Sequence, residues 1–163
     1  MKLEIRYAEH PGDVKQYGTE ELRNHFLCEK VFFEDEIHLC YTHSDRVVFG
    51  GAFPVEKKPC LEGGKDFGSD VFLDRRELGI ICIVETGIVT VDGKDYPMKK
   101  GDGLYVGKGT GNVTFSATGG NEPPRRRGLN LTHRFTRDSP GTPAEYTASS
   151  ILSKSSSPRE GRH

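Results

Sequence analysis

The chain has 163 residues, enough for one hydrophobic core of ordinary size, and its 34% hydrophobic and 29% charged residues are typical of a soluble protein. A formal net charge of −1 gives no indication of a nucleic-acid or membrane-surface partner. No apolar run approaches the roughly 20 residues that span a bilayer, and the first residues contain no apolar signal segment. We therefore expect a cytoplasmic protein with no nucleic-acid and no membrane partner.

One short helix is expected near the N-terminus. The segment that begins at Tyr17 offers Thr19 as the N-cap residue and places Leu22, Phe26 and Leu27 at helical spacing. Helical periodicity disappears after this segment, so the remainder must be built from other elements.

Strands dominate the following part of the sequence. Alternating and β-branched runs lie within residues 36–55 and 70–109, and turn residues recur about every ten positions, which is typical of an antiparallel sandwich or barrel. Asp92-Gly93 separates two such runs and predicts a type I′ hairpin, because that turn needs positive φ at two successive positions. The predicted fold class is therefore mainly β.

The amino-acid composition changes after about residue 121. Residues 122–163 are rich in Pro, Ser, Thr, Gly and Arg and show no sustained period. This segment carries a net charge of about +4, which leaves about −5 for residues 1–121. We expect a disordered tail rather than an RNA-binding arm, because the segment contains only two aromatic residues, Phe135 and Tyr146.

The cysteines and histidines form no recognisable metal-binding motif. No C-x-x-C pair is present, and we interpret Cys28, Cys40, Cys60 and Cys82 as buried, reduced thiols. No two histidines lie at i, i+2 or at i, i+4, and on one continuous strand His38 and His43 would face opposite sides. The sequence therefore predicts no metal ligands.

Charged residues gather beside an apolar strand at Asp74, Arg75, Arg76 and Glu77. Arginine forks match planar anions, so this cluster is a candidate for recognising a carboxylate or phosphate. The alternative is a charged turn with exposed ion pairs. Lys108, between two glycines, either reaches an anionic sugar or only makes a turn soluble.

Three stretches closely resemble the first half of the 5-keto-4-deoxyuronate isomerases, the 4-deoxy-L-threo-5-hexosulose-uronate ketol-isomerases of bacterial pectin breakdown. They are "ELRNHFLCEKVFFEDEIHLCYTHSDRVVFGG", "FLDRRELGIICIVETGIVTVDGKDY" and "GDGLYVGKGTGNVTFSA". The resemblance covers roughly residues 17–117 in colinear order.

The resemblance implies two cupin-like barrels in tandem, of which residues 1–121 would be the first, and a hexameric assembly. It implies conversion of 5-dehydro-4-deoxy-D-glucuronate to 3-deoxy-D-glycero-2,5-hexodiulosonate, with a zinc ion held by three histidines and a glutamate of the second barrel. The tail stands where that barrel would begin, so we expect no bound zinc and suspect a reading-frame shift near Pro123. In this half, the candidates for uronate contact are Arg75, Arg76, Glu77, Tyr105 and Lys108; the catalytic residues are unknown.

Three functional hypotheses remain open. The chain is an isomerase by descent, or a truncated and inactive cupin that binds uronate or associates with itself, or a short binding module whose basic tail contacts a partner. Removal of a second barrel is also expected to expose apolar surface and to favour aggregation or non-native oligomers.

Overall fold

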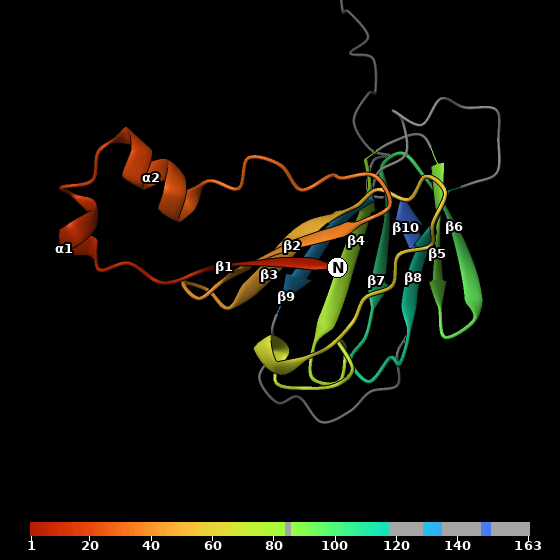
Figure 1. Cartoon of the computed structure of the whole chain (residues 1–163). Helices are drawn as coiled ribbons and strands as arrows, with labels where there is room; N and C mark the ends of the chain where they lie inside the picture. The colour runs from red at the N-terminus through yellow and green to blue at the C-terminus, as the bar shows by residue number, and fades with distance from the viewer. Residues whose placement is uncertain (84–85, 118–128, 135–147, 151–163) are drawn as a thin grey trace, which may run out of the picture.

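The computed structural model describes residues 1–83, 86–117, 129–134 and 148–150, which form two β-sheets that share one core (Figure 1). The larger sheet has the order β1 (Lys2–Arg6), β2 (Ile37–Thr42), β3 (Val47–Ala52), β9 (Leu129–Arg134), β4 (Glu77–Cys82), β7 (Asp102–Val106) and β10 (Ala148–Ser150). The smaller sheet has the order β6 (Lys94–Lys99), β5 (Thr86–Val91) and β8 (Val113–Ser116). All pairings are antiparallel except the parallel β1–β2 pair, which confirms the mainly β prediction.

Alternation of side chains along the strands explains the core. On β4, Leu78, Ile80 and Cys82 are buried, whereas Ile81 between them is exposed, because successive side chains of a strand point to opposite faces. Val89, Val91 and Phe115 close the core from the smaller sheet. The two sheets thus pack face to face, while closure into a cupin barrel remains a prediction.

The predicted Asp92-Gly93 hairpin is confirmed between β5 and β6. Asp92 has φ 47° and Gly93 has φ 83°, the two positive values that a type I′ turn requires. The Asp92 carboxylate also accepts a hydrogen bond from the backbone N–H of Asn112 at 2.8 Å. The hairpin tip is thereby fixed to the loop that precedes β8.

Two helices, rather than one, project to one side of the sheets, beyond the C-terminal end of β1: α1 (Pro11–Val14) and α2 (Thr19–Phe26) (Figure 1). The predicted Thr19 cap is wrong, because Gly18 is the N-cap residue and its N–H donates to the Glu21 carboxylate at 2.7 Å. Neither helix has a buried residue. We call residues 7–33, which contain both helices and the segment after them, the arm.

The arm is held together by polar contacts. Glu9 accepts hydrogen bonds from the Tyr17 hydroxyl at 2.8 Å and pairs with His25 at 2.7 Å, and the Tyr17 and His25 rings stack. The hydrogen bond to Glu9 raises the pKa of Tyr17 to about 12. No described helix is long and apolar enough to cross a membrane.

The end of the arm crosses the outer face of the larger sheet. At Gly51 of β3, a Cβ atom would lie 2.5 Å from the Phe32 ring, so glycine is what permits this close approach. Beyond the arm, a short 3₁₀ turn, η1 (Lys65–Phe67), precedes β4.

The structure differs from the predicted tail at two segments. Residues 129–134 and 148–150 form β9 and β10, and β9 lies between β3 and β4 with Leu131 opposite both Gly50 and Ile80. An unpaired strand edge leaves backbone donors and acceptors without partners, and β9 supplies partners to two edges at once. The other predicted tail residues lie outside the described part of the chain.

The prediction of four buried thiols is half right. Cys40 and Cys82, on strands, are buried, and all four cysteines are free thiols. Cys28, in the segment after α2, and Cys60, which forms an isolated bridge with Thr114 of β8, are only partly buried.

Candidate functional site

Arg76, a predicted contact for a substrate carboxylate, lies in the interior. Arg76 is only 4% exposed. Its guanidinium lies 5.0 Å from the centre of the Phe67 ring and shares a hydrogen bond with Tyr41. Burial lowers the pKa of the Arg76 guanidinium, although the ordinary value is so high that the group stays charged. This arrangement makes Arg76 a support for the aromatic core rather than a surface group.

The other four predicted residues lie nearer the surface but on different segments. Glu77 and Tyr105 come from the neighbouring strands β4 and β7 and share a hydrogen bond; burial, then Glu77, raises the pKa of Tyr105. Arg75 is exposed and lies 3.6 Å from the carboxylate of Asp74. Lys108 follows β7 in a loop whose Gly109 N–H donates to the Leu73 carbonyl at 2.7 Å, which brings that loop beside the Asp74–Arg76 segment.

The structure thus brings these residues into one neighbourhood. Arg76 faces the interior, whereas Glu77 and the 43%-exposed Tyr105 lie on the outer face. Their role in uronate contact remains a prediction.

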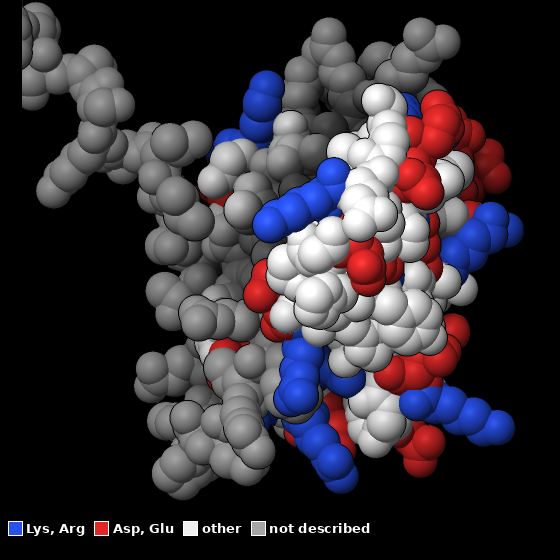
Figure 2. All heavy atoms as spheres, turned by 90° about the vertical axis from the view of Figure 1, so that its left-hand side faces the viewer, with Lys and Arg blue, Asp and Glu red and all other residues white. Residues whose placement is uncertain are grey.

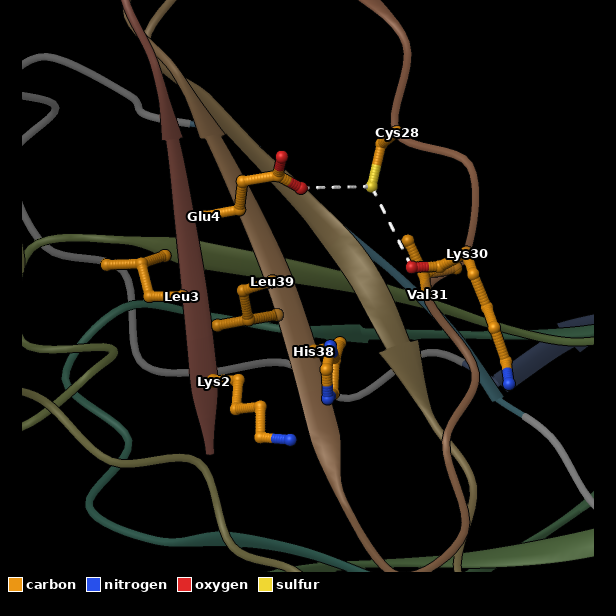
Figure 3. A pocket seen from close by; sticks show the side chains of 8 residues that line it. All are labelled: Lys2, Leu3, Glu4, Cys28, Lys30, Val31, His38 and Leu39. Atoms are coloured by element: carbon orange, nitrogen blue, oxygen red, sulfur yellow. Dashed lines mark hydrogen bonds between the residues drawn. The ribbon is translucent and has the colours of Figure 1, made fainter. Parts of the chain in front are cut away.

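A pocket of different composition lies where the arm meets β1 and β2 (Figure 3). Its cavity volume is about 210 Å³, and its lining includes Glu4, Cys28, Lys30 and His38. Because β1 and β2 pair with Glu4 opposite Cys40, both side chains lie on the same face of the sheet. The segment after α2 then brings Cys28 over that face.

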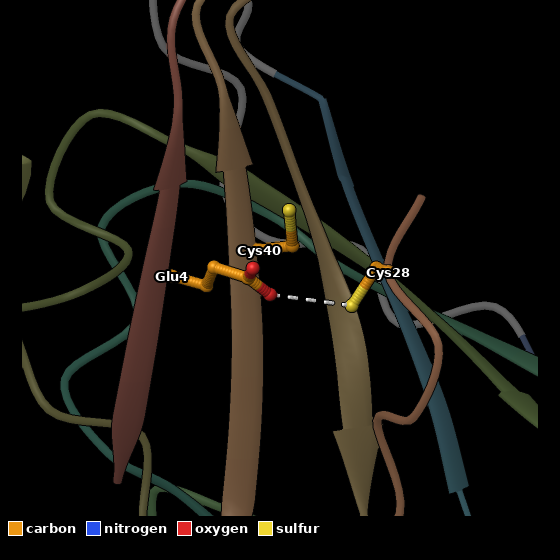
Figure 4. A group of neighbouring side chains, drawn as sticks. All are labelled: Glu4, Cys28 and Cys40. Carbon is orange, nitrogen blue, oxygen red and sulfur yellow. Dashed lines mark hydrogen bonds between the residues drawn. The ribbon is translucent and has the colours of Figure 1, made fainter. Parts of the chain in front are cut away.

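Glu4, Cys28 and Cys40 form the one cluster of three potential metal ligands among the described residues (Figure 4). Their ligand atoms all lie within 4.8 Å of one another, and the Cys28 thiol donates to the Glu4 carboxylate at 3.6 Å. Burial raises the pKa of Cys28, and burial followed by the nearby Cys28 and Glu4 raises the pKa of Cys40 to about 11. Arg6 pairs with the Glu4 carboxylate and also hydrogen-bonds Cys40.

The other end of this pocket contains aromatic and cationic groups. The His38 ring stacks on Phe33 with centroids 3.8 Å apart and lies 2.7 Å from the Glu36 carboxylate. Lys30 lies 4.3 Å from the centre of the same Phe33 ring. The His38 hydrogen bond, followed by that of Lys2, lowers the pKa of Glu36.

Charges of both signs surround this side of the molecule. Figure 2 shows acidic and basic side chains close to one another around an uncharged area, without a field of one sign. Over the described residues, this face therefore offers no extended attraction for a polyanion or a polycation.

Comparison with known proteins gives a consistent result. No protein-family model matches the chain. The chain is 46% identical over 123 residues to 4-deoxy-L-threo-5-hexosulose-uronate ketol-isomerase 2 of Enterococcus faecalis, a match that covers 76% of this chain and 45% of that protein. Over 118 residues it is 43% identical to the ketol-isomerase of Bacillus subtilis, with 72% and 43% covered.

The chain is a homologue of the 4-deoxy-L-threo-5-hexosulose-uronate ketol-isomerases. It spans about 45% of the length of these relatives, consistent with an N-terminal portion of the family. The resemblance inferred from the three sequence stretches is thereby confirmed.

The zinc ligands implied by that resemblance do not fit this ketol-isomerase homologue over its described residues. Three histidines and a glutamate are required, whereas the cluster in the described ranges contains two thiols and one carboxylate. His38 and His43 are both engaged with aromatic rings, His38 with Phe33 and His43 with Tyr41. We derive no catalytic step through a zinc ion in this part of the chain.

Sequence reasoning missed the Glu4–Cys28–Cys40 cluster. Each ligand comes from a different segment. Glu4 and Cys40 become neighbours only because β1 pairs in parallel with β2, and the whole arm separates these two strands in the sequence. The only local signal is the alternation of residues in "KLEIR" and "IHLCY", which places Glu4 and Cys40 on the outer face of the sheet, where Cys40 is nevertheless buried.

Proposed function

We propose that this chain serves a uronate ketol-isomerase as its N-terminal β-domain and does not itself contain the reacting centre. The observation that carries the proposal is 46% identity over 123 residues that make up only 45% of the relative. The reaction would convert 5-dehydro-4-deoxy-D-glucuronate to 3-deoxy-D-glycero-2,5-hexodiulosonate.

The chemistry of the reaction explains why this domain would need the rest of the enzyme. A base removes a proton from the hydroxyl-bearing carbon, and a proton is returned to the neighbouring carbon through an enediolate, so no oxidant is consumed. The negative charge that develops on oxygen must be stabilised by a positioned electrophile. Within the described ranges, the three histidines and the glutamate that the resemblance implies for the zinc ion are not brought together, so this electrophile would come from the rest of the enzyme.

The outer face of the larger sheet supports packing against further protein. Ile81 and Tyr105 are 40% and 43% exposed, and the pairing of β4 with β7 places them on the same face; Ile83, which follows β4, is 41% exposed. Apolar side chains grouped on one face in this way mark interaction surfaces. If these apolar side chains are left uncovered in the isolated chain, we expect it to aggregate or to associate with itself.

Split-protein complementation tests the proposal. The chain is co-expressed with the part of the Enterococcus faecalis relative that lies outside the matched region, and isomerisation of 5-dehydro-4-deoxy-D-glucuronate is followed with added zinc. We expect no turnover by the chain alone and turnover by the pair. The relative's own matched region, supplied as a separate chain, is the positive control.

Two results would overturn the proposal. Turnover by the purified chain alone would place the reacting centre within it. Failure of the pair, when the relative's own two parts restore activity, would show that this β-domain has lost the role.

Uronate binding by this domain is the second candidate, and it rests on the proximity of Arg75 to the Lys108 loop. An exposed guanidinium and an ammonium from adjoining loops match a carboxylate. Calorimetric titration with the uronate is expected to show binding that Arg75→Ala and Lys108→Ala each weaken, with Lys58→Ala as the control. Equal affinity in all three variants would exclude these residues.

A further inference from the structure

The junction between the arm and the sheet contains two thiols and a carboxylate that come from three separate segments. Glu4 lies on β1, Cys40 on β2 and Cys28 in the segment after α2, and their ligand atoms lie within 4.8 Å of one another (Figure 4). We propose that Glu4, Cys28 and Cys40 bind one thiophilic divalent cation, of which Zn²⁺ is the representative, and that this ion fastens the arm to the sheet. The proposal is independent of the proposed ketol-isomerase function.

The distances suit a tetrahedral ion. With Zn–S bonds of about 2.3 Å and Zn–O bonds of about 2.0–2.2 Å, neighbouring ligand atoms are separated by about 3.5–3.8 Å. The Cys28 sulfur already lies 3.6 Å from the Glu4 carboxylate oxygen, and no pair of ligand atoms exceeds 4.8 Å. A disulfide would require the two sulfurs to approach to about 2.05 Å, which is a larger movement from such separations.

Charge balance also favours a cation at this place. Two thiolates and one carboxylate leave a divalent ion with one excess negative charge. The guanidinium of Arg6, which pairs with Glu4 and hydrogen-bonds Cys40, supplies the compensating positive charge. Arg6 also donates to the Leu27 carbonyl at 3.0 Å, so the same residue positions the arm and one of the ligands.

The surroundings provide both shielding and an open position. Cys40 is buried, while Glu4 and Cys28 border the 210 Å³ cavity that opens beside them (Figure 3). A cavity of this size has room for a water molecule as the fourth ligand. The closed side limits exchange of the ion, and the open side gives it a path of entry.

Cobalt titration of the full chain tests the site. The protein is reduced, freed of metal and titrated with Co²⁺, and a thiolate-to-cobalt charge-transfer band is expected that saturates at one ion per chain. Cys28→Ser is expected to raise the apparent dissociation constant for Co²⁺ at least about tenfold, and Glu4→Gln is expected to raise it less. Cys60→Ser is the matched control, because Cys60 is also partly buried but lies elsewhere, 3.0 Å from Asn112.

A second measurement uses the unmodified chain, so it does not depend on the folding of a variant. Alkylation by iodoacetamide is followed by peptide mapping with and without Zn²⁺. We expect Zn²⁺ to slow the alkylation of Cys28 at least about tenfold and to leave that of Cys60 unchanged.

The proposal would be overturned by a cobalt complex without the charge-transfer band, or by one that Cys28→Ser leaves intact. It would equally be overturned if Zn²⁺ left Cys28 alkylation unchanged while glutathione disulfide converted Cys28 and Cys40 to a disulfide. In that case the pair would be a redox pair: two thiols would lose two electrons and two protons to the glutathione disulfide.

Discussion

The two-sheet body and the N-terminal arm are built on different principles. The body has fully buried side chains from both sheets, such as Ile80 and Phe115, whereas neither helix of the arm has any buried residue. The arm relies instead on capping, on the Glu9 contacts with Tyr17 and His25, and on a few attachments to the sheet. Apolar burial therefore determines the body, and local polar contacts determine the arm.

Replacing a phenylalanine in each region gives the sharpest contrast. Phe115 is 0% exposed and Phe26 is 54% exposed. Phe115→Ala removes a core ring and leaves a cavity, so we expect a loss of about 3–5 kcal/mol in the free energy of unfolding. Phe26→Ala is expected to change it by less than about 0.5 kcal/mol.

Urea unfolding of the two variants and of the unchanged chain measures both values. A loss from Phe26→Ala comparable to that from Phe115→Ala would mean that the arm buries its apolar face in solution, and the proposed division between the regions would be wrong.

Gly51→Ala is expected to cause the next largest loss of stability, because Gly51 lies where the arm contacts the body. The new Cβ would lie 2.5 Å from the Phe32 ring and 2.9 Å from the Val31 carbonyl oxygen. Overpacking of this kind is expected to cost about 1–3 kcal/mol. Removal of the ring by Phe32→Ala should relieve part of that cost, so the double variant is expected to be more stable than the sum of the single losses predicts.

The contradictory outcome is additivity. If Gly51→Ala costs the same with and without the Phe32 ring, then Phe32 does not lie over Gly51 and the arm is attached elsewhere.

Much of the body could be predicted from the sequence, since the strand alternation and the Asp92-Gly93 turn are local signals. Other features depend on contacts between distant segments. β9 lies in a segment of loop-like composition and pairs between β3 and β4, and Cys28 meets Cys40 only because the arm returns to β2. The inward position of Arg76 over Phe67 is another such feature, because nothing in the local sequence shows which way its side chain turns.

Asp35, just beyond the arm, gives a pH-dependent contrast. It has a φ of 59°, and its Oδ1 accepts backbone N–H bonds from Val55, Glu56 and Lys57 at 2.8, 2.8 and 2.9 Å. Burial alone would raise the pKa of Asp35, but the three hydrogen bonds outweigh it and lower the pKa. Asp35→Ala removes these bonds and strains the positive φ, so we expect a loss of about 1–2 kcal/mol at neutral pH.

The sign of the pH dependence follows from the lowered pKa. The stabilisation from the Asp35 charge is present above the unfolded pKa of about 3.9 and is lost as the pH falls through the folded value. The stability difference between the unchanged chain and Asp35→Asn should therefore shrink on acidification. A difference that is constant between pH 7 and pH 2 would show that the charge has no part in holding this turn.

Glu21→Ala has the smallest expected effect and tests whether the arm forms its helix locally. The Glu21 carboxylate accepts the Gly18 N–H at 2.7 Å at the start of α2, whereas the neighbouring Glu20 makes no such bond in the described structure. Loss of a capping contact costs about 0.5–1 kcal/mol of helix stability. Because no residue of this helix is buried, this loss should appear as faster amide exchange confined to residues 19–26, with global unfolding unchanged. Glu20→Ala retains the cap and controls for the loss of a first-turn charge, so equal exchange in the two variants would show that the helix dipole, not the cap, stabilises the arm.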